Sequence, residues 1–116
     1  MHNYKNLEVW KRSLELATQV YSLTNNFPKE EKYGLVSQIR RCSVSISSNI
    51  AEGSGRGSDR EFRLFLNYAL GSCFELETQL LISQNLELVV EEIQNNILSE
   101  LTQIQKIIYT LIKKYS

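Results

Sequence analysis

The stretch that decides the fold is QIRRCSVSISSNIAEGSGRGSDREF, residues 38–62. Its segment Ser43–Ser47 alternates polar and apolar residues as a half-buried strand does. Over a longer window, apolar and small residues recur every three or four positions, the period of one helix face. The series is Leu35, Ile39, Cys42, Ile46, Asn49 and Gly53. Because no Gly or Pro interrupts residues 35–52, the longer period predicts a helix that ends at a glycine-rich turn.

Three further helices are predicted around this one. The first runs from Leu7 to Leu23 with Asn6 as its N-cap, and the second, just described, runs from Tyr33 to Ile50 or Glu52. Pro28 separates them because proline cannot continue a helix.

Ser58 and Glu61 form a capping box that opens the third helix, which we expect to stop at Asn85. The fourth helix runs from about Val89 to Lys114. Four amphipathic helices with short connections predict an all-α fold, an up-down-up-down antiparallel four-helix bundle with left-handed packing. Residues 1–116 are expected to form one domain.

The first helix carries two apolar stripes side by side. One comprises Leu7, Trp10, Leu14, Ala17 and Tyr21. The other comprises Val9, Leu16, Val20 and Leu23. Together they are wider than the stripe that packing against one core requires. We therefore expect one face inside the subunit and the other against a second subunit, with Leu16 and Val20 protected from water.

Composition restricts the function. Thirteen Lys and Arg balance thirteen Asp and Glu, which argues against a strongly basic nucleic-acid binder. No apolar run is long enough to span a membrane, and the N-terminus lacks a signal-peptide core, so a cytoplasmic location is expected. Cys42 and Cys73 fall on core positions and are interpreted as buried thiols rather than as a disulfide or a reactive pair.

Two groups of arginines are candidates for nucleic-acid contact. Arg56, Arg60 and Arg63 surround the glycine turn, where they could bind phosphates or be neutralised by neighbouring carboxylates. Arg40 is a further candidate. The glycine turn itself lacks the Gly-Lys-Ser/Thr of a P-loop, so a plain inter-helix turn is favoured over an anion-binding loop.

Structural roles are predicted for five other polar or small residues. Arg41 is expected to form an ion pair with Glu75 or Glu77 on the third helix. Asn49 is expected to be buried, hydrogen-bonded and register-fixing. Gly53 ends the second helix, and Ser58 caps the third.

Nothing in the sequence indicates catalysis. His2 is the single histidine and lies in a terminus expected to fray. There is no Glu-x-x-His pair for a di-iron bundle and no His/Cys spacing for zinc. We therefore expect no enzymatic activity, no cofactor, no metal and no small-molecule substrate.

Several motifs recur together in one protein family. They are Leu7-x-Val9-Trp10, Phe27-Pro28-x-x-Glu31-x-Tyr33-Gly34-Leu35, Gln38-x-Arg40-Arg41, Ser45-Ile46-x-x-Asn49-Ile50-Ala51-Glu52-Gly53-x-Gly55-Arg56, Glu61-Phe62-x-x-Phe65-Leu66 and Gly71-Ser72-x-x-Glu75-Leu76-Glu77-x-Gln79-Leu80. With them the chain resembles, over nearly its whole length, the bacterial four-helix-bundle family first met as proteins encoded in rRNA intervening sequences. Some members are labelled ribosomal proteins. Cys42 departs from the Ala more usual in the family.

The resemblance implies a ring-like homopentamer without known catalytic activity. A relative, the accessory protein of diversity-generating retroelements, works beside a reverse transcriptase and binds nucleic acid through a basic surface. Two hypotheses follow: a homo-oligomeric accessory or scaffold for RNA, DNA or a nucleic-acid enzyme, and alternatively a structural oligomer or protein-binding adaptor that binds no nucleic acid.

Overall fold

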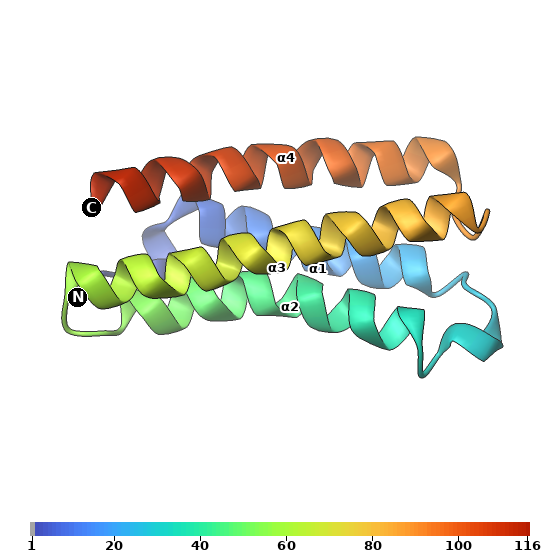
Figure 1. Cartoon of the computed structure of the whole chain (residues 1–116), viewed down its shortest axis with the longest axis horizontal. Coiled ribbons are helices and arrows are strands. Elements are labelled where there is room, and N and C mark those ends of the chain that lie inside the picture. Colours follow the sequence, from blue (N-terminus) through green and yellow to red (C-terminus); the bar gives the residue numbers. More distant parts are fainter. Residues whose placement is uncertain (1) are drawn as a thin grey trace.

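The computed structural model describes residues 2–116 and shows four long helices lying side by side (Figure 1). They are α1 Glu8–Thr24, α2 Leu35–Ser54, α3 Asp59–Asn85 and α4 Glu91–Lys114, with the short 3-10 helices η1 Tyr4–Asn6 and η2 Lys29–Glu31. Each long helix packs on its neighbours in sequence, and α1 also packs on α4. Within residues 2–116 there is no strand, so the helical interpretation of Ser43–Ser47 is confirmed, as is the antiparallel four-helix bundle.

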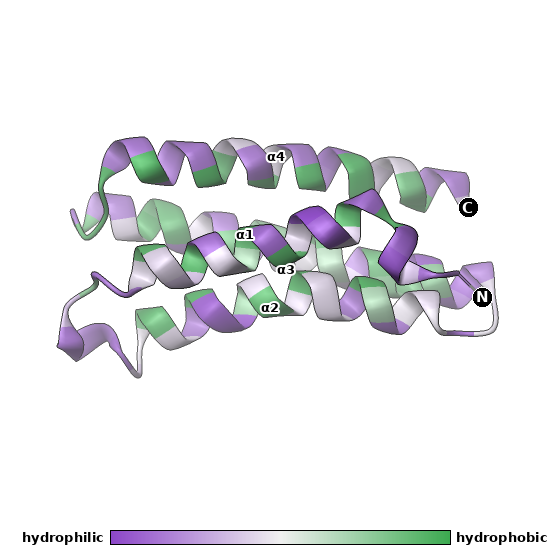
Figure 2. Cartoon of the chain, turned by 180° about the vertical axis from the view of Figure 1, so that it is seen from behind, coloured by the Kyte–Doolittle hydropathy of each residue, from purple (hydrophilic) through white to green (hydrophobic). Residues whose placement is uncertain are grey.

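The core lies along the bundle axis and draws on all four long helices. Its largest fully buried side chains include Leu16 of α1, Ile46 of α2, Phe62 of α3 and Ile104 of α4. The hydropathy colouring shows green bands along the helices and hydrophilic segments at η1 and in the α1–α2 connection (Figure 2). The bundle measures 43 × 24 × 20 Å.

One of the two predicted helix caps is present. The Ser58 hydroxyl accepts a hydrogen bond from the Glu61 backbone N–H at 3.2 Å, which confirms the N-cap of α3. Asn6 is not the N-cap of α1, because it belongs to η1 and Leu7 occupies the cap position. The side chain that caps η1 is Asn3, which accepts from the Lys5 N–H.

Gly53 does not end α2, contrary to the sequence expectation. The helix continues through Gly53 to Ser54, and within the described residues no glycine has a positive φ. Gly53 serves close packing instead. A Cβ on this residue would lie 2.5 Å from Phe65 Cβ on α3 and 3.2 Å from the Phe62 ring. The small side chains of α2 therefore do allow a neighbouring helix to approach closely, and that neighbour is α3.

The two apolar stripes of α1 differ in their exposure to solvent. Leu16 and Val20 are fully buried inside the subunit, so this stripe belongs to the bundle's own core. It is Leu14, on the other stripe, that remains 43% exposed. Val90 and Ile93, at the start of α4, are exposed as well. They line an open groove between α4 and α1.

Replacing Gly53 with alanine is expected to destabilise the protein. The added methyl group must push α2 and α3 apart, and overpacking of this kind typically costs about 1–3 kcal/mol of unfolding free energy. Gly71→Ala is the matched control, because a Cβ on this exposed α3 residue would meet nothing within 4 Å. The control should stabilise the helix by about 0.5–1 kcal/mol. Urea unfolding measures both, and equal effects of the two substitutions would contradict the proposed role of Gly53.

Candidate nucleic-acid interface

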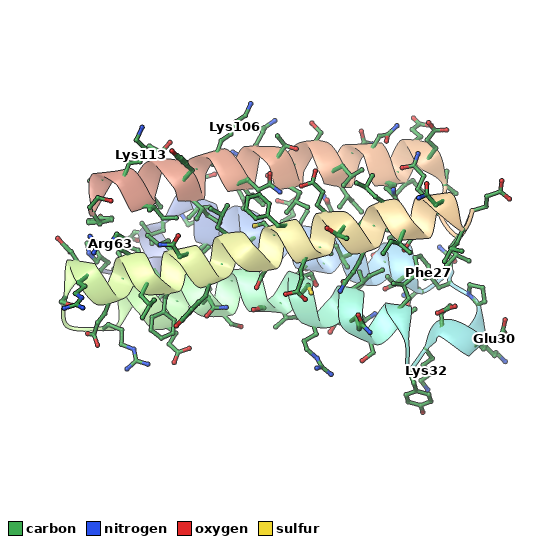
Figure 3. All side chains as sticks on the ribbon, in the orientation of Figure 1. Phe27, Glu30, Lys32, Arg63, Lys106 and Lys113 are labelled. Carbon is green, nitrogen blue, oxygen red and sulfur yellow. The ribbon has the colours of Figure 1, made fainter. Side chains whose placement is uncertain are left out.

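The four arginines predicted to contact nucleic acid lie in two separate places. Arg40 is near the start of α2, whereas Arg56, Arg60 and Arg63 surround the turn that follows its end. The intervening fourteen residues of helix separate the two places by about 20 Å, at about 1.5 Å per residue. Figure 3 shows Arg63 at one end of the bundle and Lys32 at the other. The four arginines therefore do not form one patch.

The arginines at the α2–α3 turn are largely occupied by contacts within the subunit. Arg56 pairs with Glu52 at 3.1 Å and lies over the Phe65 ring. Arg63 donates to the Tyr115 backbone carbonyl at 2.8 Å and so ties α3 to the end of α4. Arg60 is exposed.

The same turn also carries acidic groups. Glu52, Asp59 and Glu61 equal the three arginines in number, and Glu61 lines the same surface hollow as Arg60 and Arg63. The turn therefore presents little net positive charge to a phosphate backbone.

Arg40 lies in different surroundings at the α1–α2 end. Its guanidinium sits 4.5 Å from the centre of the Tyr21 ring, and it donates to Thr24 Oγ1 at 2.9 Å and to Asn25 Oδ1 at 3.0 Å. All of these partners are neutral. These contacts fix the position of Arg40 against α1 and leave its positive charge uncompensated.

The ion pair predicted for Arg41 is absent within residues 2–116. Arg41 is exposed, while its neighbour Cys42 faces α3 and donates to Glu75 Oε2 at 3.3 Å. Glu77 lies on the opposite flank of α3, where it accepts from Gln105 of α4 at 3.1 Å. Arg41 therefore points to solvent rather than to α3.

Asn49 belongs to a polar seam between α2 and α3 and not to the hydrophobic core. It is half-buried and donates to the backbone carbonyl and the hydroxyl of Ser45, and Ser45 in turn meets Ser72 of α3 at 2.9 Å. Ile50 takes the buried position instead. The expected hydrogen bonding of Asn49 is present, but among residues 2–116 its hydrogen bonds reach α3 only through Ser45.

His2 is held against the end of the bundle and not frayed. Its backbone N–H donates to the Ser54 carbonyl at 2.8 Å, and Nε2 lies 3.2 Å from an Asp59 carboxylate oxygen. Its ring packs 4.6 Å from Phe62 and 4.8 Å from Tyr115, measured between ring centres. Local sequence patterns do not predict the contact of His2 with Tyr115, because the two residues lie near opposite ends of the chain.

A hydrogen-bonded ion pair that local sequence patterns do not predict joins α1 to α4. Arg12 donates to both Glu100 carboxylate oxygens, at 2.6 and 2.9 Å, and to Gln103 Oε1. The bidentate pair lowers the pKa of Glu100 below its ordinary value, chiefly through the Arg12 hydrogen bond. Such a carboxylate stabilises the fold above its unfolded-state pKa and loses that contribution as the pH falls.

The two cysteines are buried and unpaired. Burial is the main cause that raises the pKa of Cys42 to about 11 and that of Cys73 to about 12, and the nearby carboxylates Glu75 and Glu77 add to it. A nucleophilic thiol needs the opposite shift. Within residues 2–116, no group of three His, Cys, Asp or Glu side chains is placed to hold a metal ion.

In the described part of the chain, these features define a small antiparallel bundle of four helices. The family of 23S rRNA-intervening sequence proteins matches residues 5–110, and the chain belongs to this family.

Among solved structures, the bundle is similar to a protein of unknown function from the S23 ribosomal protein family of Bacteroides thetaiotaomicron. The two chains are 31% identical, with a TM-score of 0.84 over 90% of this chain and 95% of the other. No match was found among curated proteins.

Across residues 2–116, none of the helices combines the length and the apolar character that crossing a membrane would require.

The two thiols are expected to react slowly in the native protein. At pH 8, raising a pKa from 9.0 to about 11 reduces the thiolate fraction about 100-fold, and burial slows access further. Labelling with a thiol reagent at pH 8, with and without denaturant, measures the difference. The thiols of the unfolded chain keep a pKa of about 9.0 and therefore ionise at a lower pH than those of the native protein. As a result, the free energy of unfolding falls as the pH rises above about 9. A native thiol that reacts as fast as in denaturant would contradict this assignment.

Proposed function

We propose that the chain is a non-enzymatic subunit of a homo-oligomer that serves as a scaffold for nucleic acid or for a nucleic-acid enzyme. The observation that carries the proposal is the placement of exposed apolar side chains on two opposite sides of the bundle. Within the described residues, the diagonal helix pairs, α1 with α3 and α2 with α4, have no Cα atoms within 8 Å of each other. The side formed by α1 and α2 is therefore opposite the side formed by α3 and α4.

The α1–α2 face contains Leu14 and Val44, which are both exposed. Leu14 precedes Tyr21 by two helical turns and so shares its face, and the Tyr21 ring lies under Arg40 of α2. Val44 follows Arg40 by one turn and points to the same side. One turn after Val44, α2 presents the small, exposed side chain of Ser48, which would let another helix approach.

The α3–α4 face contains Phe74, Leu81 and Tyr109. Phe74, 52% exposed, and Leu81 lie one turn before and one turn after Glu77, whose carboxylate accepts from Gln105 of α4. Tyr109 follows Gln105 by one turn of α4. A face with three large exposed apolar side chains favours a protein contact.

Because the two faces differ, association would pair one face of a subunit with the other face of the next. Head-to-tail contacts of this kind close into rings or continue as filaments. The chain's resemblance to its family favours a closed ring of five. The sequence pattern predicted a second contact face on α1 alone. The structure supports the α1–α2 face, through Leu14, together with a separate face on α3 and α4.

The nucleic-acid part of the proposal is supported by the α1–α2 end of the bundle. Lys29, Lys32, Arg40 and Arg41 lie there with two carboxylates, Glu30 and Glu31, and none of the four cations forms an ion pair within residues 2–116. The alternative, an oligomer or adaptor that binds no nucleic acid, is supported by the neutralised arginines at the α2–α3 turn and by zero net charge overall.

A charged side chain placed on either apolar face is expected to abolish assembly. Leu14→Arg blocks the α1–α2 face and Phe74→Arg blocks the α3–α4 face, so each variant alone should scatter light as a 13.4 kDa monomer. Mixed together, they should form a dimer and nothing larger, because one intact face remains on each.

Gln19→Arg, on the α1–α4 side, is the matched control and should assemble as the unaltered chain does. Because all three side chains are exposed, helical content and melting temperature should change little. A monomeric unaltered chain at tens of micromolar would contradict the assembly.

Nucleic-acid binding is expected to weaken steeply with salt. Three phosphate contacts on a single strand predict a loss of roughly 20-fold in affinity between 50 and 200 mM salt. Fluorescence anisotropy with labelled RNA and DNA at the two salt concentrations measures this loss. Absence of binding even at 50 mM salt would rule out direct contact and leave a scaffold for a nucleic-acid enzyme or an adaptor as the remaining functions.

A further inference from the structure

A surface hollow lies where α1 ends and α2 begins. It measures about 390 Å³, and its lining includes Tyr21, Lys32, Tyr33, Arg40 and Arg41. A second hollow of about 220 Å³ shares Lys32 and Arg40 with the first and adds Lys29. The two hollows therefore adjoin at Lys32 and Arg40, and we call the pair the depression.

The depression is positively charged. No carboxylate lines either hollow, although four cations do. Two acidic residues lie nearby: Glu30 points away from the bundle (Figure 3), and the Glu31 carboxylate lies against Gly34. Four cations against two carboxylates leave a local excess of positive charge, in contrast to the balanced α2–α3 turn. This charge suits a ligand that carries phosphates.

The depression also presents aromatic rings. Tyr33 is 88% exposed, and the Nζ of Lys32 lies 5.3 Å from the centre of its ring. An aromatic side chain left this exposed gains nothing from the core of its own subunit. Tyr21, half exposed, is covered by Arg40, and this contact holds a guanidinium in the wall of the first hollow.

From this geometry we infer that the depression binds single-stranded nucleic acid. An unpaired base stacks on the Tyr33 ring, and the phosphates beside that base contact Lys32 and Arg41. Arg40, held by Thr24 and Asn25, supplies a fixed positive charge in the wall. This inference rests on the nucleic-acid part of the proposed function and adds a site and a preference for unpaired strands.

The preference for single strands follows from the tyrosine. Bases in a duplex are stacked on one another and offer no free face to a side chain on the protein surface, whereas unpaired bases can be splayed onto an aromatic ring. Stacking of this type is tolerant of sequence because every base has such a face. The depression is thus expected to distinguish single strands from duplexes and to discriminate little between sequences.

Anisotropy titrations with labelled oligonucleotides test the inference. The probes are a poly-U RNA of about 15 nucleotides, within the range that single-strand sites occupy, and the A·U duplex made from it. Tyr33→Ala should weaken binding of the single strand roughly 5- to 150-fold, the loss expected for one stacked base. Tyr33→Phe keeps the ring and should restore binding. Arg41→Ala should weaken binding and make it less dependent on salt.

Matched controls come from the opposite end of the bundle. Tyr68→Ala removes another exposed tyrosine, which packs edge-to-face on Phe65, and Arg60→Ala removes the same charge as Arg41→Ala. Both should leave binding of the single strand unchanged. Light scattering on each variant establishes that assembly is intact.

The outcomes separate the inference from the proposed function. Loss with Tyr33→Ala, recovery with Tyr33→Phe and unchanged controls support the site. Equal binding of duplex and single strand that responds to Arg60→Ala and not to Tyr33→Ala overturns the site and leaves nucleic-acid binding in place. If neither probe binds at 50 mM salt, the site and the nucleic-acid part of the proposed function are both overturned, while assembly is judged by light scattering alone.

Discussion

The rest of the bundle depends on the close approach of α2 and α3. At Gly53 there is no room for even one methyl group. About two turns earlier in α2, the hydroxyls of Ser45 and of Ser72 on α3 lie 2.9 Å apart. Side chains this small let the helices pack backbone to backbone. Other polar contacts at this interface join Cys42 to Glu75 and Gln79 to Gln38, and Asn49 donates to Ser45. With this pair fixed, the apolar sides of α2 and α3 form a common surface on which α1 and α4 pack.

The periodicity of the sequence was sufficient for the four helices, and most helix ends followed from local chemistry. Ser58 and Asn85 mark the ends of α3 because capping and termination depend on neighbouring residues. What local patterns could not decide was which of two adjacent stripes on α1 faces the core, since both satisfy the same spacing. The contacts of His2 with Phe62 and of Arg12 with Glu100 join residues 60 and 88 positions apart, and no local signal encodes them.

The candidate sites show why residue type alone is a weak guide to function. Arg40 and Arg56 looked equivalent in the sequence, yet one has only neutral partners and the other is paired with Glu52. The difference arises from the residues one helical turn away and on the adjacent helix. Tyr33 was noted in the sequence only as part of the family motif. Its exposure, and its position in one hollow with Lys32 and the α2 arginines Arg40 and Arg41, become evident only in three dimensions.

The link between Arg12 and Glu100 has a consequence for biosynthesis. The first helix leaves the ribosome early, but the carboxylate that receives its guanidinium is made only when most of the chain has been translated. Until then the partner helix for one flank of α1 does not exist, and apolar residues such as Leu16 and Leu23 lack part of their cover. A chain whose translation has not reached the last helix thus exposes apolar surface, which makes it prone to aggregate and dependent on chaperones.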